Sequence, residues 1–221
     1  MKIHIATASA EELRWAAECG LADGALVSSS MLERSFGVAD LRTRALDFTR
    51  IVDGPVYVSR GTRDAELLYH EARELARSSD QLIADMPLDG STFEALHRAV
   101  GEGSRVAASM VFTSSQALLA SRAGASAVLV PVSALDAQGL HVGATLAEMR
   151  AIFDKHLIEC EIVAVCPLTA AQVGACAQAG VDAVTVDVAT LRDLLLHPFT
   201  DRTLDEMLPD ILARGRHRIA V

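Results

Sequence analysis

The residue whose position most suggests chemistry is Asp85, in the stretch LIADMPLD at 82–89. The apolar run Leu82-Ile83-Ala84 is typical of a buried strand, and the aspartate stands where that core should continue. A buried carboxylate is costly unless it is hydrogen-bonded, paired or used in a reaction. It is therefore a structural carboxylate held by hydroxyl groups, a general acid or base with a raised pKa, or a metal ligand. The metal role is the weakest, because one carboxylate without an inward histidine makes a poor site.

Eight apolar runs of strand length recur along the chain, with helical patterns between them. The runs lie near 3–7, 25–30, 55–60, 81–86, 105–111, 127–132, 161–166 and 183–188. The predicted helices cover 11–19, 64–77, 92–100, 115–122, 145–155, 169–179 and 190–196, with further helical stretches at 40–50 and 203–213. Because long polar linkers are absent, the sequence predicts one domain over 1–221.

A short pattern that joins a helix to the next strand occurs three times. The copies, AAECGLADGALV, LASRAGASAVLV and ACAQAGVDAVTV, each contain small residues, a glycine and a short turn. Gly20, Gly124 and Gly180 suit the left-handed position that ends a helix. Eight such β/α units predict an α/β protein, a single (β/α)8 TIM barrel. A doubly wound open sheet is the alternative, but the first turn, ATASAEE, lacks the GxGxxG pattern of a dinucleotide site.

The predicted barrel brings one end of every strand to a common mouth, where the active sites of this fold lie. Asp85 is next to last in its strand and belongs to this mouth, and we expect it to be the catalytic residue. Strand residues alternate between the interior and the helices. The analogous late positions are Ala6, Ser28, Ser59, Ser109, Pro131, Cys166 and Thr185 or Asp187. The expected substrate contacts are Ser28, Ser59, Ser109 and Cys166.

Two other reactive side chains have less specific surroundings. Cys166 is either a nucleophile at the mouth or a small apolar residue, and no neighbouring histidine is evident to activate it. His4 shares the inward parity of the first strand but lies a layer below Ala6, so we expect a packed core histidine. The four cysteines show no CxxC pairing, which argues against a structural zinc site or a disulfide scaffold. The sequence thus indicates no metal and no cofactor.

The composition excludes several classes of partner. A formal net charge of −9 repels phosphate backbones, so we expect no nucleic-acid partner. The sequence contains no run of about 18 apolar residues, the length that a membrane span needs. The N-terminus MKIHIATAS lacks the apolar stretch of a signal peptide. We therefore expect a cytoplasmic protein that binds a small molecule.

The chain is 51% hydrophobic with few aromatic residues, which suits helices packed on parallel strands.

Three stretches carry a family resemblance. They are SSQALLASRAGASAVLVPVSALDAQG at 114–139, EIVAVCPLTAAQVGACAQAGVDAVTVDVATLRDLLLHP at 161–198 and the LIADMPLD strand. On these, the whole chain resembles the transaldolase family, specifically small transaldolases of the fructose-6-phosphate aldolase type. The resemblance implies a barrel whose fourth strand carries a lysine that forms a Schiff base with the substrate ketone. It also implies ring-shaped homo-oligomers in which the C-terminal segment packs on a neighbouring subunit.

The sequence departs from the family pattern at the positions that do its chemistry. Asp85 stands where the family has its Schiff-base lysine, and a carboxylate cannot form an imine. The two lysines of the chain, Lys2 and Lys155, lie at the entry of the first strand and at the end of a helix. The strand-five hydroxyl survives as Ser109. The remaining departures are Ala6 for an aspartate, Leu26-Val27-Ser28-Ser29 for Thr-Thr-Asn-Pro, Ser59 for a glutamine, Pro131 for a tyrosine, Ala134 for a phosphate-binding arginine and Cys166 for a serine.

Three functional hypotheses remain open. The first is a divergent enzyme that uses Asp85 for acid/base chemistry on a small, non-phosphorylated carbonyl or hydroxyl compound. The second is a catalytically inactive pseudoenzyme that serves as a binding or partner scaffold. The third is residual aldolase or transaldolase activity in carbohydrate metabolism without an imine. The basic stretch ARGRHRIAV at 213–221 is either a solvated end or a contact with a neighbouring subunit in a homo-oligomer.

Overall fold

The computed structural model describes the backbone of residues 1–37 and 40–218 and the side chains of residues 1–37 and 40–208. The chain divides into two compact units, Met1–Val188 and Ala189–Val221. The first contains all eight strands, and the second contains helix α11 (Pro198–Arg218). The single domain expected over 1–221 stays a prediction, and the side chains of the basic stretch 213–221 lie outside the described residues.

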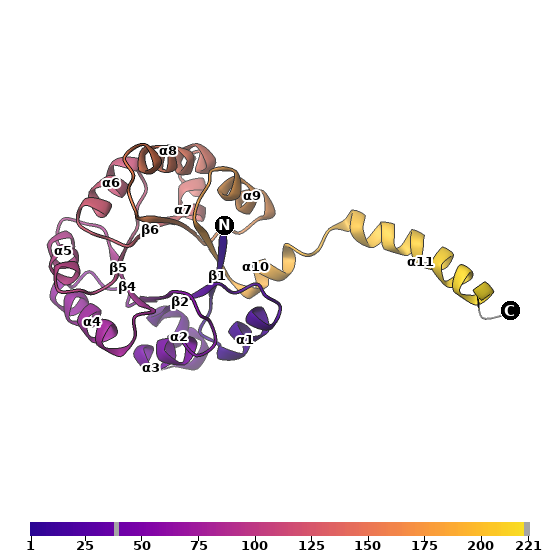
Figure 1. Ribbon diagram of the computed structural model, residues 1–221, viewed down its shortest axis with the longest axis horizontal. Coiled ribbons are helices and arrows are strands. Elements are labelled where there is room, and N and C mark those ends of the chain that lie inside the picture. Colours follow the sequence, from indigo (N-terminus) through magenta and orange to yellow (C-terminus); the bar gives the residue numbers. More distant parts are fainter. Residues whose placement is uncertain (38–39, 219–221) are drawn as a thin grey trace. The chain divides into compact units, whose positions relative to one another are not determined.

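Eight parallel strands close into a barrel in the order of the chain, and β8 pairs with β1 to complete the ring. Figure 1 shows the helices of the first unit around the outside of these strands. This confirms the predicted (β/α)8 fold, and every predicted strand overlaps an observed one. The strands are β1 (Lys2–Ala6), β2 (Gly24–Ser28), β3 (Val56–Ser59), β4 (Leu82–Pro87), β5 (Val106–Ser109), β6 (Ala127–Pro131), β7 (Glu161–Val165) and β8 (Ala183–Val186).

Most of the helices follow the predicted ranges, whereas α2 and α7 were not expected. These two follow β2 and β6 directly and are only 8 and 6 residues long, too short to show apolar periodicity. Among the described residues, no helix has both the length and the hydropathy needed to cross a bilayer. The helices before α11 are α1 (Ala10–Glu18), α2 (Ser29–Phe36), α3 (Leu41–Phe48), α4 (Ala65–Ser78), α5 (Phe93–Gly101), α6 (Ser114–Arg122), α7 (Val132–Ala137), α8 (Val142–Lys155), α9 (Ala170–Gln178) and α10 (Val188–Asp193).

Side-chain caps fix where several helices begin. Ser9 and Thr169 each accept a hydrogen bond from the backbone N–H three residues later, as their positions before α1 and α9 predict. Thr113 and Gln116 form a reciprocal capping box at the start of α6. Because each of these helices follows the C-terminal end of a strand, the caps also hold the loops that surround the mouth of the barrel.

The barrel interior is apolar in its middle layer and polar at both ends. The middle layer contains Ala6, Leu26, Ile83, Ala107, Leu129, Val163 and Ala183. Tyr57 belongs to the same cluster and is in register with Leu26 and Ile83, and its ring lies 5.5 Å from that of the fully buried His4. At the strand entries, Lys2 Nζ lies 2.8 Å from Glu161 Oε1. His4 is therefore the packed core histidine that its parity predicts, and burial lowers its pKa to about 4.

The turn from α6 into β6 generates a stability prediction. Gly124 has a φ of +95°, in the left-handed region, and a Cβ atom there would lie 2.7 Å from Val100 Cγ1. Replacing Gly124 by alanine adds backbone strain and a clash with the valine. We expect the free energy of unfolding to fall by about 1–3 kcal/mol, measured by urea denaturation.

Gly174→Ala is the matched control for Gly124→Ala. Gly174 lies inside α9, and a Cβ atom there would meet no atom within 4 Å. Alanine is the better helix former, so this change should raise the free energy of unfolding by about 0.5–1 kcal/mol. Equal effects of the two substitutions would show that the left-handed turn does not constrain Gly124.

Candidate active site

Three neighbouring strands each place one polar residue in a single row at the mouth. The register pairs Ser28 of β2 with Ser59 of β3, and Ser59 with Asp85 of β4. On β5, Ser109 pairs with Pro87, two residues beyond Asp85, and therefore has the same inward parity. The structure thus brings together Asp85 and the three serines that the sequence pattern selected.

These four residues line one cavity of about 280 Å³. The other lining residues are Leu26, Ser30, Gly61, Met110, Leu129, Pro131 and Val165. Sequence reasoning selected Pro131 but missed Met110 and Val165. Met110 directly follows β5 in a left-handed conformation, with a φ of +56° and a largely exposed side chain. The alternation of residues along a strand cannot predict such a lining residue, because the direction of the Met110 side chain depends on the turn and not on the strand.

Asp85 is almost fully enclosed, with 7% of its surface exposed. Its Oδ1 atom is buried without a hydrogen-bond partner among the described residues. Burial raises the pKa of the Asp85 carboxyl above its ordinary value, and hydrogen bonding to the hydroxyls of Ser109 and Ser59 offsets part of that shift. The group is therefore displaced toward the carboxylic acid, the form that donates a proton.

The cavity has no positive charge of its own, since no lysine or arginine of the described chain lines it. The loop after β3 carries two arginines, and both are ion-paired. Arg60 Nη2 lies 2.9 Å from Glu71 Oε1, and Arg63 Nε lies 2.8 Å from Asp89 Oδ2. The described residues also contain no group of three or more His, Cys, Asp or Glu side chains that could hold a metal ion. The arrangement suits proton transfer on an uncharged ligand.

Cys166 has a different environment from the four residues of the mouth. On β7, the side chains that point into the barrel are those of Val163 and Val165. The strand ends at Val165, so Cys166 lies just beyond it. Cys166 is not among the residues that line the cavity. Cys166 is exposed as a residue, but partial burial of its thiol and the nearby Asp187 carboxylate raise the pKa of that thiol. A raised pKa keeps the thiol protonated, which is the opposite of what a nucleophile requires. A substrate contact by Cys166 stays a prediction.

Ser28 has a structural task beside its place in the cavity. Its Oγ accepts a hydrogen bond from the backbone N–H of Met31 at 3.2 Å and lies 3.0 Å from Ser30 Oγ. It thereby caps α2, which starts directly after β2. Sequence reasoning missed this task because it did not predict α2. Ser28 thus fixes the loop at one edge of the cavity as well as lining it.

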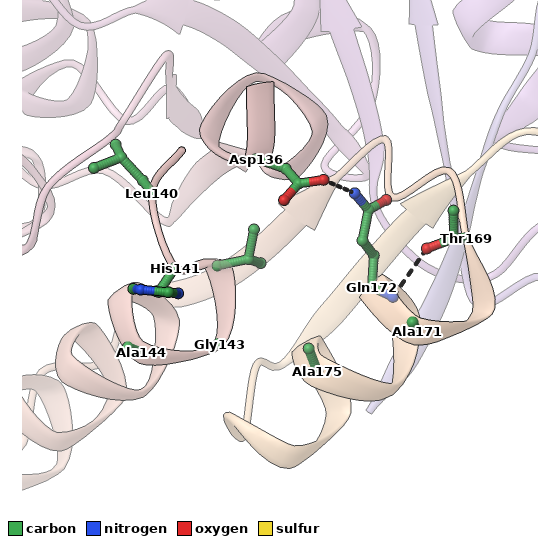
Figure 2. Close-up of a pocket in the computed structure, with 10 residues that line it drawn as sticks. Asp136, Leu140, His141, Gly143, Ala144, Thr169, Ala171, Gln172 and Ala175 are labelled. Atoms are coloured by element: carbon green, nitrogen blue, oxygen red, sulfur yellow. Dashed lines mark hydrogen bonds between the residues drawn. The ribbon is translucent and has the colours of Figure 1, made fainter. Parts of the chain in front are cut away.

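A larger cavity, of about 720 Å³, lies between the α7–α8 connection and α9 and does not include Asp85. Figure 2 shows Asp136 and Gln172 directed toward each other there, and Gln172 Nε2 donates a hydrogen bond to Asp136 Oδ2 at 2.9 Å. Gln172 Oε1 also accepts a hydrogen bond from the backbone N–H of Leu168 at 2.7 Å. The titratable residues that line this larger cavity, Asp136 and His141, are exposed. A desolvated acid or base is therefore found at the smaller cavity, which is the candidate active site.

Comparison with known proteins finds relatives along nearly the whole chain. The family model for transaldolase/fructose-6-phosphate aldolase matches residues 35–220. A protein named "Probable transaldolase" from Brucella ovis is 32% identical over 216 residues, which cover 98% of this chain and 99% of the relative. A protein of the same name from Chlorobium phaeobacteroides is also 32% identical, with 95% of this chain and 96% of the relative covered.

Solved structures resemble the chain in fold. The crystal structure of a "putative fructose-1,6-biphosphate aldolase" from Coccidioides immitis superposes with a TM-score of 0.60 at 16% sequence identity. The superposition covers 85% of this chain and 74% of that chain. At this identity, the likeness shows the barrel architecture alone.

The environment of Asp85 predicts how stability depends on pH. Because the pKa of Asp85 is raised in the folded state, its contribution to stability is fully present below the pKa of an unfolded aspartate, about 3.9, and is lost as the pH rises toward the folded value. Asparagine carries no such charge. The Asp85→Asn variant should therefore gain stability relative to the wild type as the pH rises above about 4, by up to about 1.4 kcal/mol for each pH unit until the folded pKa is reached.

Urea denaturation between pH 4 and pH 8 measures this difference. Asp53→Asn, which makes the same change at an exposed position, is the control for the substitution itself. An Asp85→Asn variant whose stability difference from the wild type is the same at every pH would contradict the raised pKa.

Proposed function

The chain belongs to the transaldolase/fructose-6-phosphate aldolase family, and we propose that it is a divergent enzyme that uses Asp85 for acid/base chemistry without forming an imine. The substrate we propose is a small, non-phosphorylated carbonyl or hydroxyl compound. The observation that carries this proposal is a nearly enclosed carboxyl with a raised pKa, lining a cavity with three serine hydroxyls. Perturbed titratable groups in such cavities are typical of active sites.

Imine chemistry requires an amine at the mouth, and the positions of the two lysines argue against one. Lys2 is the first residue of β1, and its Nζ is bound to Glu161, the first residue of β7. Lys155 is the last residue of α8, which leads into the entry of β7. Both lie toward the strand entries, whereas Asp85 lies at the opposite end of its strand. We therefore propose that the protein lacks the Schiff-base lysine of its family.

Asp85 is suited to moving a proton to or from the carbon next to a carbonyl. Its carboxylate form takes the proton, the electron pair of the broken C–H bond becomes the C=C bond of an enolate, and the π pair of the carbonyl moves onto the oxygen. Once Asp85 has taken the proton, the Ser59 and Ser109 hydroxyls that donate to its carboxylate are free to turn, and they then donate to the oxygen that carries the negative charge. A raised pKa makes the carboxylate a stronger base and leaves the acid available for the return step near neutral pH.

The charges around the cavity favour a ligand without phosphate. A phosphate group needs a cation or several backbone donors to replace its hydration. The arginines after β3 are engaged by Glu71 and Asp89, and the ionised form of Asp85 repels a phosphate group. The position that the family resemblance gives to a phosphate-binding arginine is Ala134.

A catalytically inactive scaffold is the second candidate function. It is favoured by the hydrogen bonds of Ser28, which serve the start of α2. In that account Asp85 is a structural acid and the barrel presents its surface to a partner. Residual aldolase or transaldolase activity in carbohydrate metabolism is the third candidate and has the least support, because it requires the family's reaction without its amine.

We further propose a cytoplasmic homo-oligomer that assembles through the C-terminal segment. Helix α11 is 21 residues long and carries apolar residues along its described part, including Phe199, Leu204 and Met207. A long helix of this kind needs an apolar partner for stability. The family resemblance supplies the partner that we propose, a neighbouring copy of the chain.

The proposal predicts proton exchange without a trappable imine. Wild-type protein is incubated with hydroxyacetone in D2O, and deuterium uptake next to the carbonyl is followed by NMR. A second aliquot is treated with borohydride and weighed by intact mass spectrometry. We expect exchange in the wild type, at least tenfold slower exchange with Asp85→Asn, and no covalent adduct in either protein.

Each alternative gives a different result in the same experiment. An adduct on the wild-type protein would mean that a lysine forms an imine, which defeats the proposal. Folded wild-type protein that shows neither exchange nor adduct supports the inactive scaffold. An Asp85→Lys variant is the positive control for trapping, because an amine at position 85 is expected to form the adduct.

A further inference from the structure

We propose that the Asp85 cavity selects a neutral ketone with one polar edge and one hydrocarbon face, such as a short-chain monohydroxy ketone, and rejects polyhydroxylated sugars. This inference deepens the proposed function and rests on the same site. It follows from how polar and apolar side chains are divided between the two sides of the cavity.

One side of the cavity is polar. Strands β2 to β5 are consecutive in the barrel, and they contribute Ser28, Ser59, Asp85 and Ser109 to the lining. Three of these residues lie in one register row, so their oxygen atoms are spread along a single arc of the mouth. This arc hydrogen-bonds one edge of a ligand, which is the edge that bears a carbonyl and an adjacent hydroxyl group.

The other side of the cavity is apolar. Strands β6 and β7 continue the ring beyond β5, and they contribute Leu129, Pro131 and Val165. Two further apolar lining residues border the polar side: Met110 directly follows Ser109 after β5, next to β6, and Leu26 lies two residues before Ser28 on β2, toward the barrel interior. None of these side chains donates a hydrogen bond, and the Met110 thioether is only a weak acceptor. A ligand placed against this surface must present hydrocarbon.

A sugar cannot match this division. Its hydroxyl groups alternate around the carbon chain, so several of them would face Leu129, Pro131 and Val165 and lose their hydrogen bonds to water. A monohydroxy ketone has its oxygens at one end and buries its alkyl chain instead. The cavity volume of about 280 Å³ is just below the roughly 300–1,000 Å³ typical of ligand sites, which suits a small ligand.

A six-carbon monohydroxy ketone and a six-carbon sugar provide the test. The dissociation constants of 3-hydroxyhexan-2-one and of fructose for the wild-type protein are measured by NMR titration. We expect 3-hydroxyhexan-2-one to bind at least tenfold more tightly. Val165→Ser places a hydroxyl on the apolar side and should reduce that preference at least threefold. Val173→Ser on α9 is the matched control, because Val173 is also half-buried but does not line the cavity, and it should leave the preference unchanged.

The outcomes separate this inference from the proposed function. Equal or tighter binding of fructose, no measurable binding of either ketone, or an unchanged preference in a folded Val165→Ser variant overturns the inference. If hydroxyacetone exchange depends on Asp85 while fructose is preferred, only the inference fails. If 3-hydroxyhexan-2-one is preferred but no exchange occurs, the selectivity stands and the catalytic proposal fails.

Discussion

A carboxyl group that a closed sheet holds in its interior, without a cation to neutralise it, is the constraint on which the candidate site depends. Asp85 cannot turn away from the interior, because its parity on β4 fixes its direction and both neighbouring strands pair with β4. It stays enclosed, and its pKa is raised, with partial compensation from Ser59 and Ser109. The enclosure that makes the ionised form of this residue unfavourable for stability also suits it to the acid/base role that we propose.

The Lys2–Glu161 ion pair and the Asp85 carboxyl lie toward opposite ends of the barrel. Lys2 and Glu161 form an ion pair at the strand entries, and His4 and Tyr57 are buried above them. An apolar cluster, rich in alanine and including Tyr57, lies between this ion pair and the mouth. Neither lysine is among the residues that line the cavity at Asp85, although the fold itself is the one that its family uses. The change of chemistry that we propose requires no change of architecture.

The strands and the polar row at the mouth could be predicted from sequence, because apolar runs mark parallel strands and a period of two assigns Ser59 and Asp85 to the same face. The rest of the cavity could not. The apolar run of the seventh strand suggests an inward Cys166, but β7 ends at Val165 and the inward parity falls on that residue. Met110 enters the lining through a left-handed turn. Both details depend on the stagger of neighbouring strands and on turn geometry, which a local pattern does not encode.

The protonation of Asp85 is the property that tests this account most directly. Protein labelled with ¹³C at the aspartate carboxyl carbons is titrated by NMR between pH 4 and pH 8, and the Asp85 signal is assigned by its absence from the Asp85→Asn variant. We predict a carboxylic acid signal whose midpoint lies above the ordinary aspartate pKa of about 4. A signal that titrates at or below the ordinary value would contradict it, because an ionised Asp85 would then be stable in its enclosure and would have no reason to exchange protons near neutral pH.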